Sequence, residues 1–442
     1  MKYGVLLNKN NLNLGDDIQA YGTARFYPSL DYFIDRENIN DFQSENNEPV
    51  AVIMNAWYMW EKWHWPPARC IVPHFVGFHY ADHKLAVQPG SPLSYEALEG
   101  LGGEYLKAYG PIGCRDYFTR DRLQDLGIDS YFSGCITLTL PKMPERKPEK
   151  EYICIVDADK RVRKKLKELL KDSGYELKFM THNGSRDSDR SWEARKQVVE
   201  ELLTTYRNAH LVITKRLHCA LPSLSQGTPV LLIKGMDDDI RFSPYYDLLH
   251  YINTTDFLND NYTFDFANPP ENKPEYQAIA EQLTKSCQDF VARVSGEARS
   301  VAELDRFGAS DDELFRWRYG LMDRTLAMWY EERREEFKQA KADRAEYARL
   351  EAEKNKLAEQ LQSEKEKLKA ETAKLKAEQQ KLKAEKEKHK KETDALKQKL
   401  DAANSELHIL RNTFAERVKR KLRKIYYGIR NRLKKIYHRI FK

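Results

Sequence analysis

The sequence lacks the features that mark secreted, disulfide-bonded and membrane-spanning proteins. It contains only six cysteines in 442 residues, and no two of them form a CxxC pair. No apolar stretch resembling a signal peptide opens the chain, and no apolar run approaches the length needed to cross a bilayer. We therefore expect reduced, mostly buried thiols and a cytoplasmic location.

Proline is missing from residue 331 onward, where glutamate, lysine, alanine and leucine predominate. The formal net charge of +6 hides an uneven distribution, because residues 413–442 carry twelve lysines and arginines against the single Glu416. That segment contributes +11, so the preceding 412 residues have a net charge of −5. The basic character of the chain belongs to its last segment and says nothing about a site elsewhere.

The part of the chain before residue 301 has ordinary globular patterning. Apolar strand-like runs alternate with helical patterns, which is typical of a parallel sheet covered by helices. Prolines at positions 141, 144 and 148 interrupt a charged connector, as at a domain boundary. We expect an α/β fold with an N-terminal domain over residues 1–140 and a second domain over residues 150–300.

Three helical segments are expected after the second domain: an extension at 301–345, a Glu/Lys-rich segment at 346–412 and a basic amphipathic helix at 413–442. In the middle segment leucine recurs every seven residues, at positions 361, 368, 375 and 382. The second heptad seam is largely polar. The pattern fits either a weak coiled coil that joins two copies of the chain or a solvated single helix held by Glu–Lys pairs.

The basic segment 413–442 spaces aromatic and aliphatic residues three or four apart among its lysines and arginines. Such a helix suits an anionic membrane surface, where each cation contributes about 1 kcal/mol. Nucleic acid is the rival partner because phosphate attraction needs only the charge. The apolar stripe favours the membrane, so we expect no nucleic acid and a peripheral protein on the inner face of the cell membrane.

The most informative stretch has a strand–helix–strand pattern. The apolar run 211–214 predicts a buried strand, 219–226 is helix-like, and 230–233 predicts a second buried strand. Arg216 and His218 stand where the first strand ends. Ligands of open α/β sheets bind at the carboxyl ends of the strands, and a helix N-terminus favours anions. The stretch therefore predicts an anion site.

Three motifs occur in a fixed order along the chain, namely Asn13-Leu-Gly15-Asp16-Asp17, Gly113-Cys-Arg115-Asp116 leading to Leu126-Gly127-Ile128, and Val212-Ile-Thr-Lys-Arg216-Leu217-His218 with Gly227-Thr-Pro229-Val-Leu. With them the chain resembles the polysaccharide pyruvyl transferase family, and the Arg-Leu-His piece is the most specific. The resemblance implies two Rossmann-like domains facing across a cleft, as in the B-type glycosyltransferase architecture. It also implies transfer of a pyruvyl group from phosphoenolpyruvate to sugar hydroxyls, as a ketal.

Phosphoenolpyruvate carries a phosphate and a carboxylate, and arginine binds either group in a bidentate way while staying charged. Arg216 resembles the donor-binding arginine of the family, and Arg115 is the expected second clamp from the facing domain. We expect the backbone at Leu217 to add N–H donors and Arg241 to add positive charge.

His218 and Asp16 are the expected catalytic residues. His218 is expected either to hydrogen-bond the phosphate or to protonate the methylene carbon, and Asp16 to accept the proton of the attacking hydroxyl. Structural roles are the alternatives: His218 and Arg216 can cap a helix and bridge the domains, and Asp16 can be a plain helix cap. Arg115 can form a structural ion pair with Asp116.

The acceptor is expected to contact Asp17, Trp57 and Trp60. The two tryptophans stand where the family usually has a glycine-rich turn, and they can stack on sugar rings or pack as core. A metal site is not expected, because the histidines nearby fit no strong metal signature (His74, His79 and His83). No cofactor is expected, and phosphoenolpyruvate is a substrate.

These expectations describe a transferase of bacterial surface-polysaccharide synthesis that acts on a sugar or a lipid-linked oligosaccharide. Two other classes remain open from the sequence. One is a nucleotide-sugar-dependent glycosyltransferase of the same architecture, because an Arg and His clamp also holds a diphosphate. The other is a non-catalytic, membrane-associated scaffold of glycan assembly that works through its coiled coil.

Overall fold

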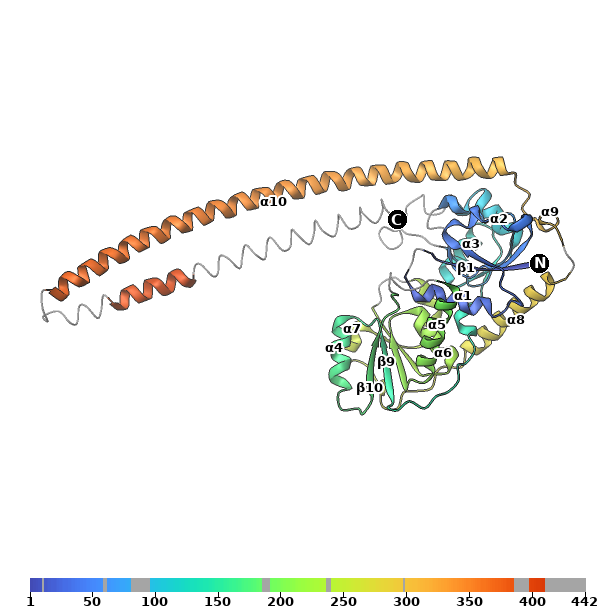
Figure 1. Ribbon diagram of the computed structural model, residues 1–442, viewed down its shortest axis with the longest axis horizontal. Helices are drawn as coiled ribbons and strands as arrows, with labels where there is room; N and C mark the ends of the chain where they lie inside the picture. Colours follow the sequence, from blue (N-terminus) through green and yellow to red (C-terminus); the bar gives the residue numbers. More distant parts are fainter. Residues whose placement is uncertain are drawn as a thin grey trace. The chain divides into compact units, whose positions relative to one another are not determined.

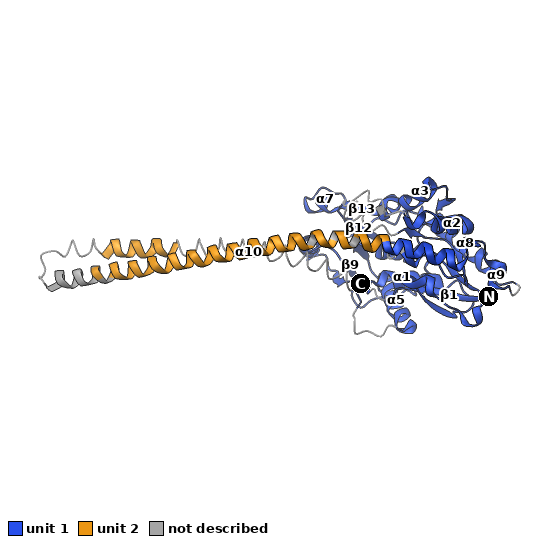
Figure 2. Ribbon diagram, turned by 90° about the horizontal axis from the view of Figure 1, so that it is seen from above, with its two compact units in different colours: residues 1–323 blue, residues 324–442 orange. Residues whose placement is uncertain are grey.

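The computed structural model describes residues 1–9, 12–58, 62–80, 96–184, 191–235, 240–296, 299–384 and 397–409. The chain divides into one compact unit of residues 1–323 and a second unit of residues 324–442, drawn blue and orange in Figure 2. The first unit contains parallel sheets and many helices (Figure 1), which confirms the prediction of a mixed α/β chain.

The first sheet has four parallel strands in the order β2–β1–β3–β5. Every residue of β3 is at most 1% exposed, because its uninterrupted apolar run is covered on both faces. The order reverses between β1 and β3, which makes the gap beyond their carboxyl ends the place for a ligand. The elements are β1 (Lys2–Leu7), α1 (Leu14–Ala24), β2 (Tyr32–Asp35), β3 (Val50–Ile53) and β5 (Ile71–His74).

Two parallel strand pairs accompany this sheet, β4 with β6 and β7 with β8. A bridge between Phe78 and Cys114 joins the segment after β5 to β7. The elements of this part are β4 (Trp57–Tyr58), β6 (His79–Tyr80), α2 (Leu101–Tyr109), β7 (Ile112–Cys114), α3 (Tyr117–Asp125), β8 (Ser130–Phe132) and the short 3-10 helices η1 (Arg36–Asp41), η2 (Glu45–Asn47), η3 (Lys62–His64), η5 (Glu96–Leu98) and η6 (Ile136–Thr139).

The second sheet has five parallel strands in the order β10–β9–β11–β12–β13. Its order reverses between β9 and β11, so the residues that follow these two strands flank a second ligand crevice. Gly227 ends α6 with a φ of 74°, the left-handed conformation that glycine adopts without strain. The elements are β9 (Tyr152–Val156), α4 (Lys160–Leu169), β10 (Glu176–Met180), α5 (Trp192–Arg207), β11 (Leu211–Thr214), α6 (Leu217–Gln226), β12 (Val230–Lys234), η7 (Ile240–Tyr245), β13 (His250–Asn253) and α7 (Thr254–Leu258).

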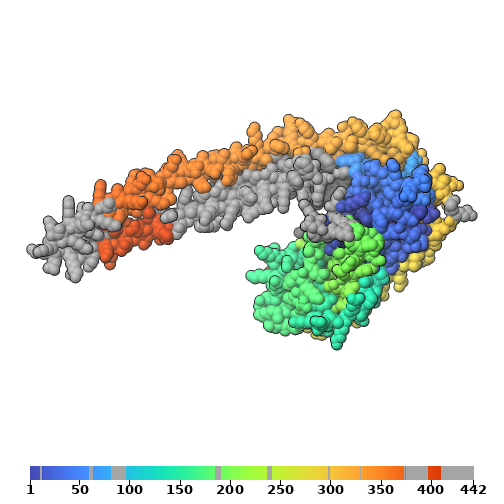
Figure 3. Space-filling view, in the orientation of Figure 1, coloured from blue at the N-terminus to red at the C-terminus, as the bar shows by residue number. Residues whose placement is uncertain are grey.

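Helix α8 (Tyr276–Val294) follows the second sheet in the chain but packs on the first. Its buried Leu283, Cys287 and Phe290 share a cluster with Tyr3 and Ile53 of the first sheet. The chain therefore returns to the first sheet after it has formed the second. In Figure 3 the blue atoms of the first half and the green atoms of the second are in direct contact.

The long helix begins inside the first unit. After α9 (Val301–Leu304), α10 (Asp311–Ala384) starts with Trp317 packed on the first half, beside Gly100 and Gly102. Residues 397–409 are also helical. Neither element tests the coiled coil, which stays a prediction. The basic helix expected at 413–442 lies outside the described residues.

No helix among the described residues is both long and apolar enough to cross a membrane. The domain boundaries expected from the sequence stay predictions, since the first compact unit contains both sheets and the first turns of α10.

Candidate active site

The N-terminal end of α1 meets the carboxyl edge of the second sheet. The backbone N–H of Leu14 donates to the carbonyl of His182 at 2.8 Å, and Gly184 N–H donates to the carbonyl of Leu12 at 2.7 Å. Asp17 forms an ion pair with Arg195 of α5 across the same boundary. These contacts fix the loop that follows β1 against the loop that follows β10.

Gly15 allows α1 to approach His218 closely. A β-carbon at this position would lie 2.8 Å from Nδ1 and 2.9 Å from Cβ of His218, closer than real side chains approach. The glycine of the Gly-Asp motif is thus required by packing between the two halves of the fold. The motif itself begins with Asn13, whose side chain accepts a hydrogen bond from Gly15 N–H and caps α1.

Replacing Gly15 by alanine should displace the His218 ring. We expect the overpacking to cost about 1–3 kcal/mol of folding free energy and to reduce kcat/KM about tenfold or more, because misplacement by an ångström is costly in an active site. Thermal melting and turnover measure the two effects. Gly296→Ala is the matched control, because a β-carbon there has only one neighbour within 4 Å, at 3.9 Å. Equal behaviour of the two variants would contradict the packing argument.

Arg115 is a buried cation without a carboxylate partner. The residue is 2% exposed, and its Nη1 donates to Gln19 Oε1 at 3.2 Å and approaches His218 Nε2 at 3.5 Å. Among the residues that the structure describes, its Nε has no hydrogen-bond partner and no carboxylate lies within ion-pair distance. Burying a charge in this way is costly unless a counter-ion is supplied. An anionic ligand would supply it.

The carboxylates near this arginine are already engaged with other groups. Asp116 does not pair with Arg115, so the structural ion pair considered from the sequence is absent from the described contacts. Each carboxylate has its own partner: Asp16 with Arg36 at 3.5 Å, Asp17 with Arg195, Asp116 with His79 at 2.5 Å, and Asp157 with Arg216 at 2.9 Å. Burial raises the pKa of Asp116, but His79 and the charge of Arg115 outweigh this and lower it, so Arg115 and Asp116 do interact electrostatically. No carboxylate of the described residues lies within ion-pair distance of the Arg115 guanidinium.

Gln19 holds Arg115 without neutralising it. Its Oε1 accepts from Arg115, while its Nε2 donates to Asp16 Oδ1 at 3.3 Å. Both ends of the amide are defined by charged neighbours, which fixes its orientation. A neutral residue at this position keeps the guanidinium available to a ligand.

Changing Gln19 to glutamate should give Arg115 an internal counter-ion. We expect the affinity for an anionic donor to fall about 10- to 100-fold, because the ligand would then compete with a buried carboxylate. Gln277→Glu makes the same charge change at an exposed position of α8 and serves as the control. Isothermal titration with the donor measures both, and unchanged affinity in Gln19→Glu would show that Arg115 does not bind the anion.

His218 is surrounded by cations at the start of α6. Its Nε2 faces Arg115 Nη1 and lies 3.7 Å from the Cys135 thiol. The residue as a whole is half-buried. This burial, reinforced by Arg115 and Arg241, holds the pKa of His218 well below its ordinary value. In the free protein the imidazole is neutral, and because Nε2 accepts from Arg115 the proton resides on Nδ1.

Arg216 and Leu217 lie at the crevice between β9 and β11. Arg216 Nε donates to Asp157 Oδ2 at 2.9 Å, and Nη2 reaches Asn183 Oδ1 at 3.4 Å. Its side chain is 36% exposed, so part of the guanidinium remains open to a ligand. Leu217 is the first residue of α6, and no side chain caps that helix. Its N-terminal N–H groups are oriented to bind an anion.

Trp57 and Arg241, expected in different subsites, lie together. The guanidinium of Arg241 is 5.1 Å from the centre of the Trp57 ring, a cation–π distance. The edge of the same indole is against His79, with ring centres 5.1 Å apart. Trp60 lies outside the described residues. Asp17 is held by Arg195, and its role toward an acceptor stays a prediction.

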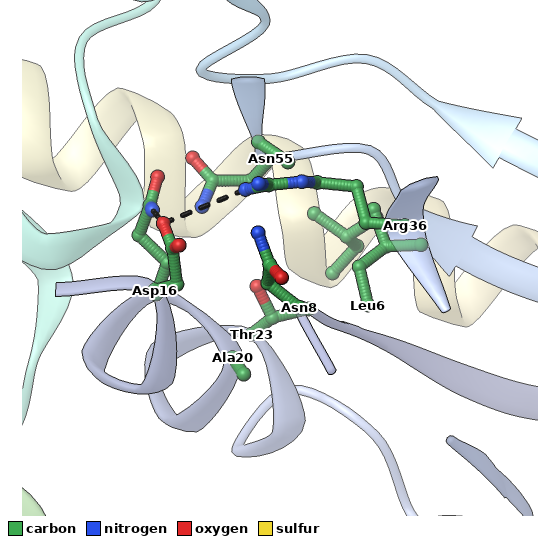
Figure 4. Close-up of a pocket in the computed structure, with 10 residues that line it drawn as sticks. Leu6, Asn8, Asp16, Ala20, Thr23, Arg36 and Asn55 are labelled. Carbon is green, nitrogen blue, oxygen red and sulfur yellow. Dashed lines mark hydrogen bonds and ion pairs between the residues drawn. The ribbon is translucent and has the colours of Figure 1, made fainter. Parts of the chain in front are cut away.

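A small pocket lies at the switch point of the first sheet (Figure 4). Asn8, Asp16, Gln19, Arg36 and Asn55 contribute to its polar lining, and its volume is about 10 Å³. Arg36 pairs with both Asp16 and Glu37. Its guanidinium therefore holds the Asp16 side chain toward the pocket. The pocket lies at the carboxyl edge of the sheet, and its space is that of about one water molecule, so it is a polar niche that positions Asp16 and not by itself a sugar site.

Three residues of this region were assigned no role in the sequence analysis, namely Gln19, Cys135 and Asp157, and His79 was considered only as a metal ligand. Asp157 follows β9 directly and adopts a φ of 50°. Burial raises its pKa, but hydrogen bonds from the His182 N–H and Thr181 and the charge of Arg216 outweigh this, so the net pKa is lowered. An acid at the end of the first strand of a sheet was the signal that could have identified it.

Two parallel sheets covered by helices define an α/β protein, and a buried arginine with no carboxylate of the described residues within ion-pair distance lies between them. A family model described as polysaccharide pyruvyl transferase matches residues 13–235, and the chain belongs to this family. The predicted resemblance is confirmed by that match. The family is one of transferases, and the matched residues include Arg115, Arg216 and His218.

No curated protein matches the chain. Among solved structures, an uncharacterised Klebsiella pneumoniae protein is 14% identical, with a TM-score of 0.33, and the match covers 57% of this chain and 92% of that one. A Listeria monocytogenes protein provisionally described as a UDP-N-acetylglucosamine 2-epimerase is 9% identical, with a TM-score of 0.35, and the match covers 66% of this chain and 94% of that one. With TM-scores this low, neither likeness carries an argument about this chain.

Proposed function

We propose that the protein transfers a pyruvyl group from phosphoenolpyruvate to two hydroxyls of a sugar, forming a ketal, in the synthesis of a bacterial surface polysaccharide. The observation that carries the proposal is Arg115, a buried guanidinium without a carboxylate partner among the described residues and 3.5 Å from His218. The family supports a transferase of this kind. In this proposal the two sheets face each other across the donor, as in the B-type glycosyltransferase architecture.

The donor binds with its phosphate and carboxylate shared between the two halves. Arg115 supplies one guanidinium from the end of β7, and Arg216 supplies the other from the end of β11. The N–H groups at Leu217 and the charge of Arg241 complete the anion site. Charge-assisted bonds of this kind are roughly twice as strong as neutral ones, and they gain from a site with little water.

His218 protonates the methylene carbon of the donor. The free imidazole is neutral because it is buried among cations. A bound donor brings several negative charges to the same place, which raises the pKa of the ring and lets it take up a proton with the substrate. Transfer of that proton turns the methylene into the methyl group and makes the adjacent carbon electrophilic. Proton uptake on donor binding is the expected signature.

The acceptor sugar lies beside the first sheet. Asp16 in the pocket of Figure 4 is the base predicted from the sequence, and Trp57, Trp60 and Asp17 are the predicted sugar contacts. The two sugar hydroxyls replace the phosphate on the same carbon. One of their protons restores His218, and the other leaves on the phosphate, so no metal, oxidant or further cofactor is required.

Ligand-dependent stabilisation separates this proposal from a glycosyltransferase. A ligand that binds only the folded protein stabilises it by about 2.7 kcal/mol at a hundred times its Kd. Phosphoenolpyruvate should therefore raise the melting temperature, whereas UDP-, GDP- and CDP-sugars should not. Stabilisation by a nucleotide sugar alone would replace the proposal with the glycosyltransferase. Donor binding without any turnover would favour a non-catalytic scaffold.

We propose in addition that the tail places the enzyme on the inner face of the membrane, close to lipid-linked acceptors. Removing residues 413–442 should move the protein from the membrane fraction to the supernatant and leave turnover of a soluble acceptor unchanged. The basis is the local charge of +11 and the interleaved apolar residues of that segment. Sedimentation with anionic vesicles measures the partition. A truncated chain that still sediments with the vesicles would refute the tail as the anchor.

A further inference from the structure

His79 and Asp116 form a buried pair that the donor site does not use. The His79 Nδ1 lies 2.5 Å from Asp116 Oδ2, and the two residues are 3% and 0% exposed. Asp116 is itself fixed, because its other oxygen accepts from the Thr119 N–H at 2.8 Å and caps α3. β6 carries His79, and the turn after β7 carries Asp116. The bridge between Phe78 and Cys114 holds these two segments side by side.

The geometry determines which ring nitrogen is available. With Nδ1 bound to the carboxylate, the ring proton resides on that side, and Nε2 keeps its lone pair. The structure gives Nε2 no hydrogen-bond partner among the described residues. A histidine oriented by a buried carboxylate in this way is the arrangement of a general base.

The groups that face this histidine belong to the proposed site. The rings of Trp57 and His79 form an edge-type pair with centres 5.1 Å apart, and the Arg241 guanidinium lies 5.1 Å from the centre of the Trp57 ring. Arg115 is next to Asp116 in the chain, and the backbone carbonyl of Arg115 accepts a hydrogen bond from the Tyr245 hydroxyl at 2.7 Å. Burial lowers the pKa of His79, and Arg115 and Arg241 act in the same direction while Asp116 opposes them. Burial is the largest of these effects, and it favours the neutral, proton-accepting ring against the pull of Asp116.

We propose that His79, held by Asp116, is the base that takes the proton from the attacking sugar hydroxyl. This role rests on the proposed function. As the hydroxyl oxygen bonds to C2 of the donor, which His218 has activated by protonating C3, its proton moves to His79 Nε2. The C2–O bond to phosphate then breaks, the electron pair leaves with the phosphate, and the phosphate carries away the proton from His79. The second hydroxyl closes the ketal and returns its proton to His218.

Asp16 is less suited to this step than the sequence suggested. Its Oδ1 is in an ion pair with Arg36 and accepts a hydrogen bond from Gln19, and the charge of Arg36 makes the carboxylate a weaker base. His79 accepts no such bond at Nε2 from the described residues. Asp16 is therefore assigned a positioning role, through Gln19, on Arg115.

The test uses variants that separate the two ring nitrogens of His79. His79→Asn keeps an amide donor near the position of Nδ1, so the bond to Asp116 survives, but it removes Nε2. Asp116→Asn retains the cap on α3 and presents an N–H to His79, which forces the proton onto Nε2, the wrong tautomer for a base. We expect kcat to fall about 10²- to 10⁴-fold in either variant, with stabilisation by phosphoenolpyruvate and the melting temperature close to wild type. The acid limb of the kcat–pH profile should disappear from the residual activity of His79→Asn.

A purely structural histidine predicts a different result. His79→Asn would then keep kcat within about threefold, since the Asp116 bond is preserved, and Asp116→Asn would affect melting more than turnover. Full activity of a folded His79→Asn variant alongside normal wild-type turnover overturns this inference alone. If the wild-type protein neither binds nor turns over phosphoenolpyruvate, the proposed function fails, and the inference with it.

Discussion

Replacing Arg115 by methionine should lower kcat/KM for phosphoenolpyruvate by about three orders of magnitude and at the same time make the protein more stable. The loss follows from two charge-assisted hydrogen bonds to the donor, each contributing about 1.5–3 kcal/mol. The gain follows because the buried guanidinium has no carboxylate partner among the described residues, and an apolar side chain of similar length removes that cost. We expect the melting temperature to rise by about 2–4 °C.

The control for this substitution is Arg120→Met. Arg120 stands on α3 near Arg115 in the chain, but its partner is Asp121 and its side chain is 31% exposed. We expect little change in activity and no increase in stability from it. Calorimetric melting and steady-state kinetics are measured on both variants. Only a ligand-binding role of Arg115 predicts that Arg115→Met raises the melting temperature and lowers kcat/KM at the same time. An Arg115→Met protein that is less stable and still active would assign the residue to the fold.

The second large effect is expected from His218→Asn. An asparagine side chain places an amide near the position of Nδ1 but cannot deliver a proton to carbon, so kcat should fall about 10²- to 10⁴-fold. Donor affinity should change less than tenfold, because the charges of Arg115 and Arg216 remain. Proton uptake on donor binding, seen by calorimetry in buffers of different ionisation enthalpy, should disappear.

His210→Asn is the matched control for that substitution. His210 stacks on Tyr175 with ring centres 4.2 Å apart, and its Nε2 bonds to the carbonyl of Ala267 at 3.0 Å, away from the site residues. Turnover and proton uptake should both be unchanged there. If His218→Asn lost donor binding but kept the same kcat, His218 would be a phosphate ligand and not an acid.

The strands of the second half were predictable because continuous apolar runs carry a strong local signal. The run 211–214 was predicted residue for residue, and 230–233 is one residue short of β12. Helix ends were less predictable. We expected a helix at 219–226 with Pro222 in its first turn, but α6 begins at Leu217, and the proline lies further inside. Residues 131–140 divide into β8 and the 3-10 helix η6, and neither has a periodicity that separates it from a loop.

The sequence allowed us to predict individual residues of the site but not the contacts between them. Arginine and histidine at a strand end indicate an anion, and that was enough to propose Arg115, Arg216 and His218. Which side chains hold which cation depends on tertiary contacts. Arg115, for example, contacts His218 across 103 positions of the chain and Gln19 across 96. The sequence could not show that Asp116 is held by His79, nor that its neighbour Arg115 has no carboxylate of the described residues within ion-pair distance.

The most direct test of the central claim follows the pyruvyl group itself. Phosphoenolpyruvate labelled in its carboxylate carbon is incubated with the protein and a bacterial pool of lipid-linked glycans, and label in the glycan and released phosphate are both counted. We predict one phosphate released for each pyruvyl group incorporated, with the label returned as pyruvate by mild acid, as expected of a ketal. Arg115→Met and His218→Asn should incorporate almost none. Glycan without label, combined with consumption of a nucleotide sugar by the same protein, would contradict the account.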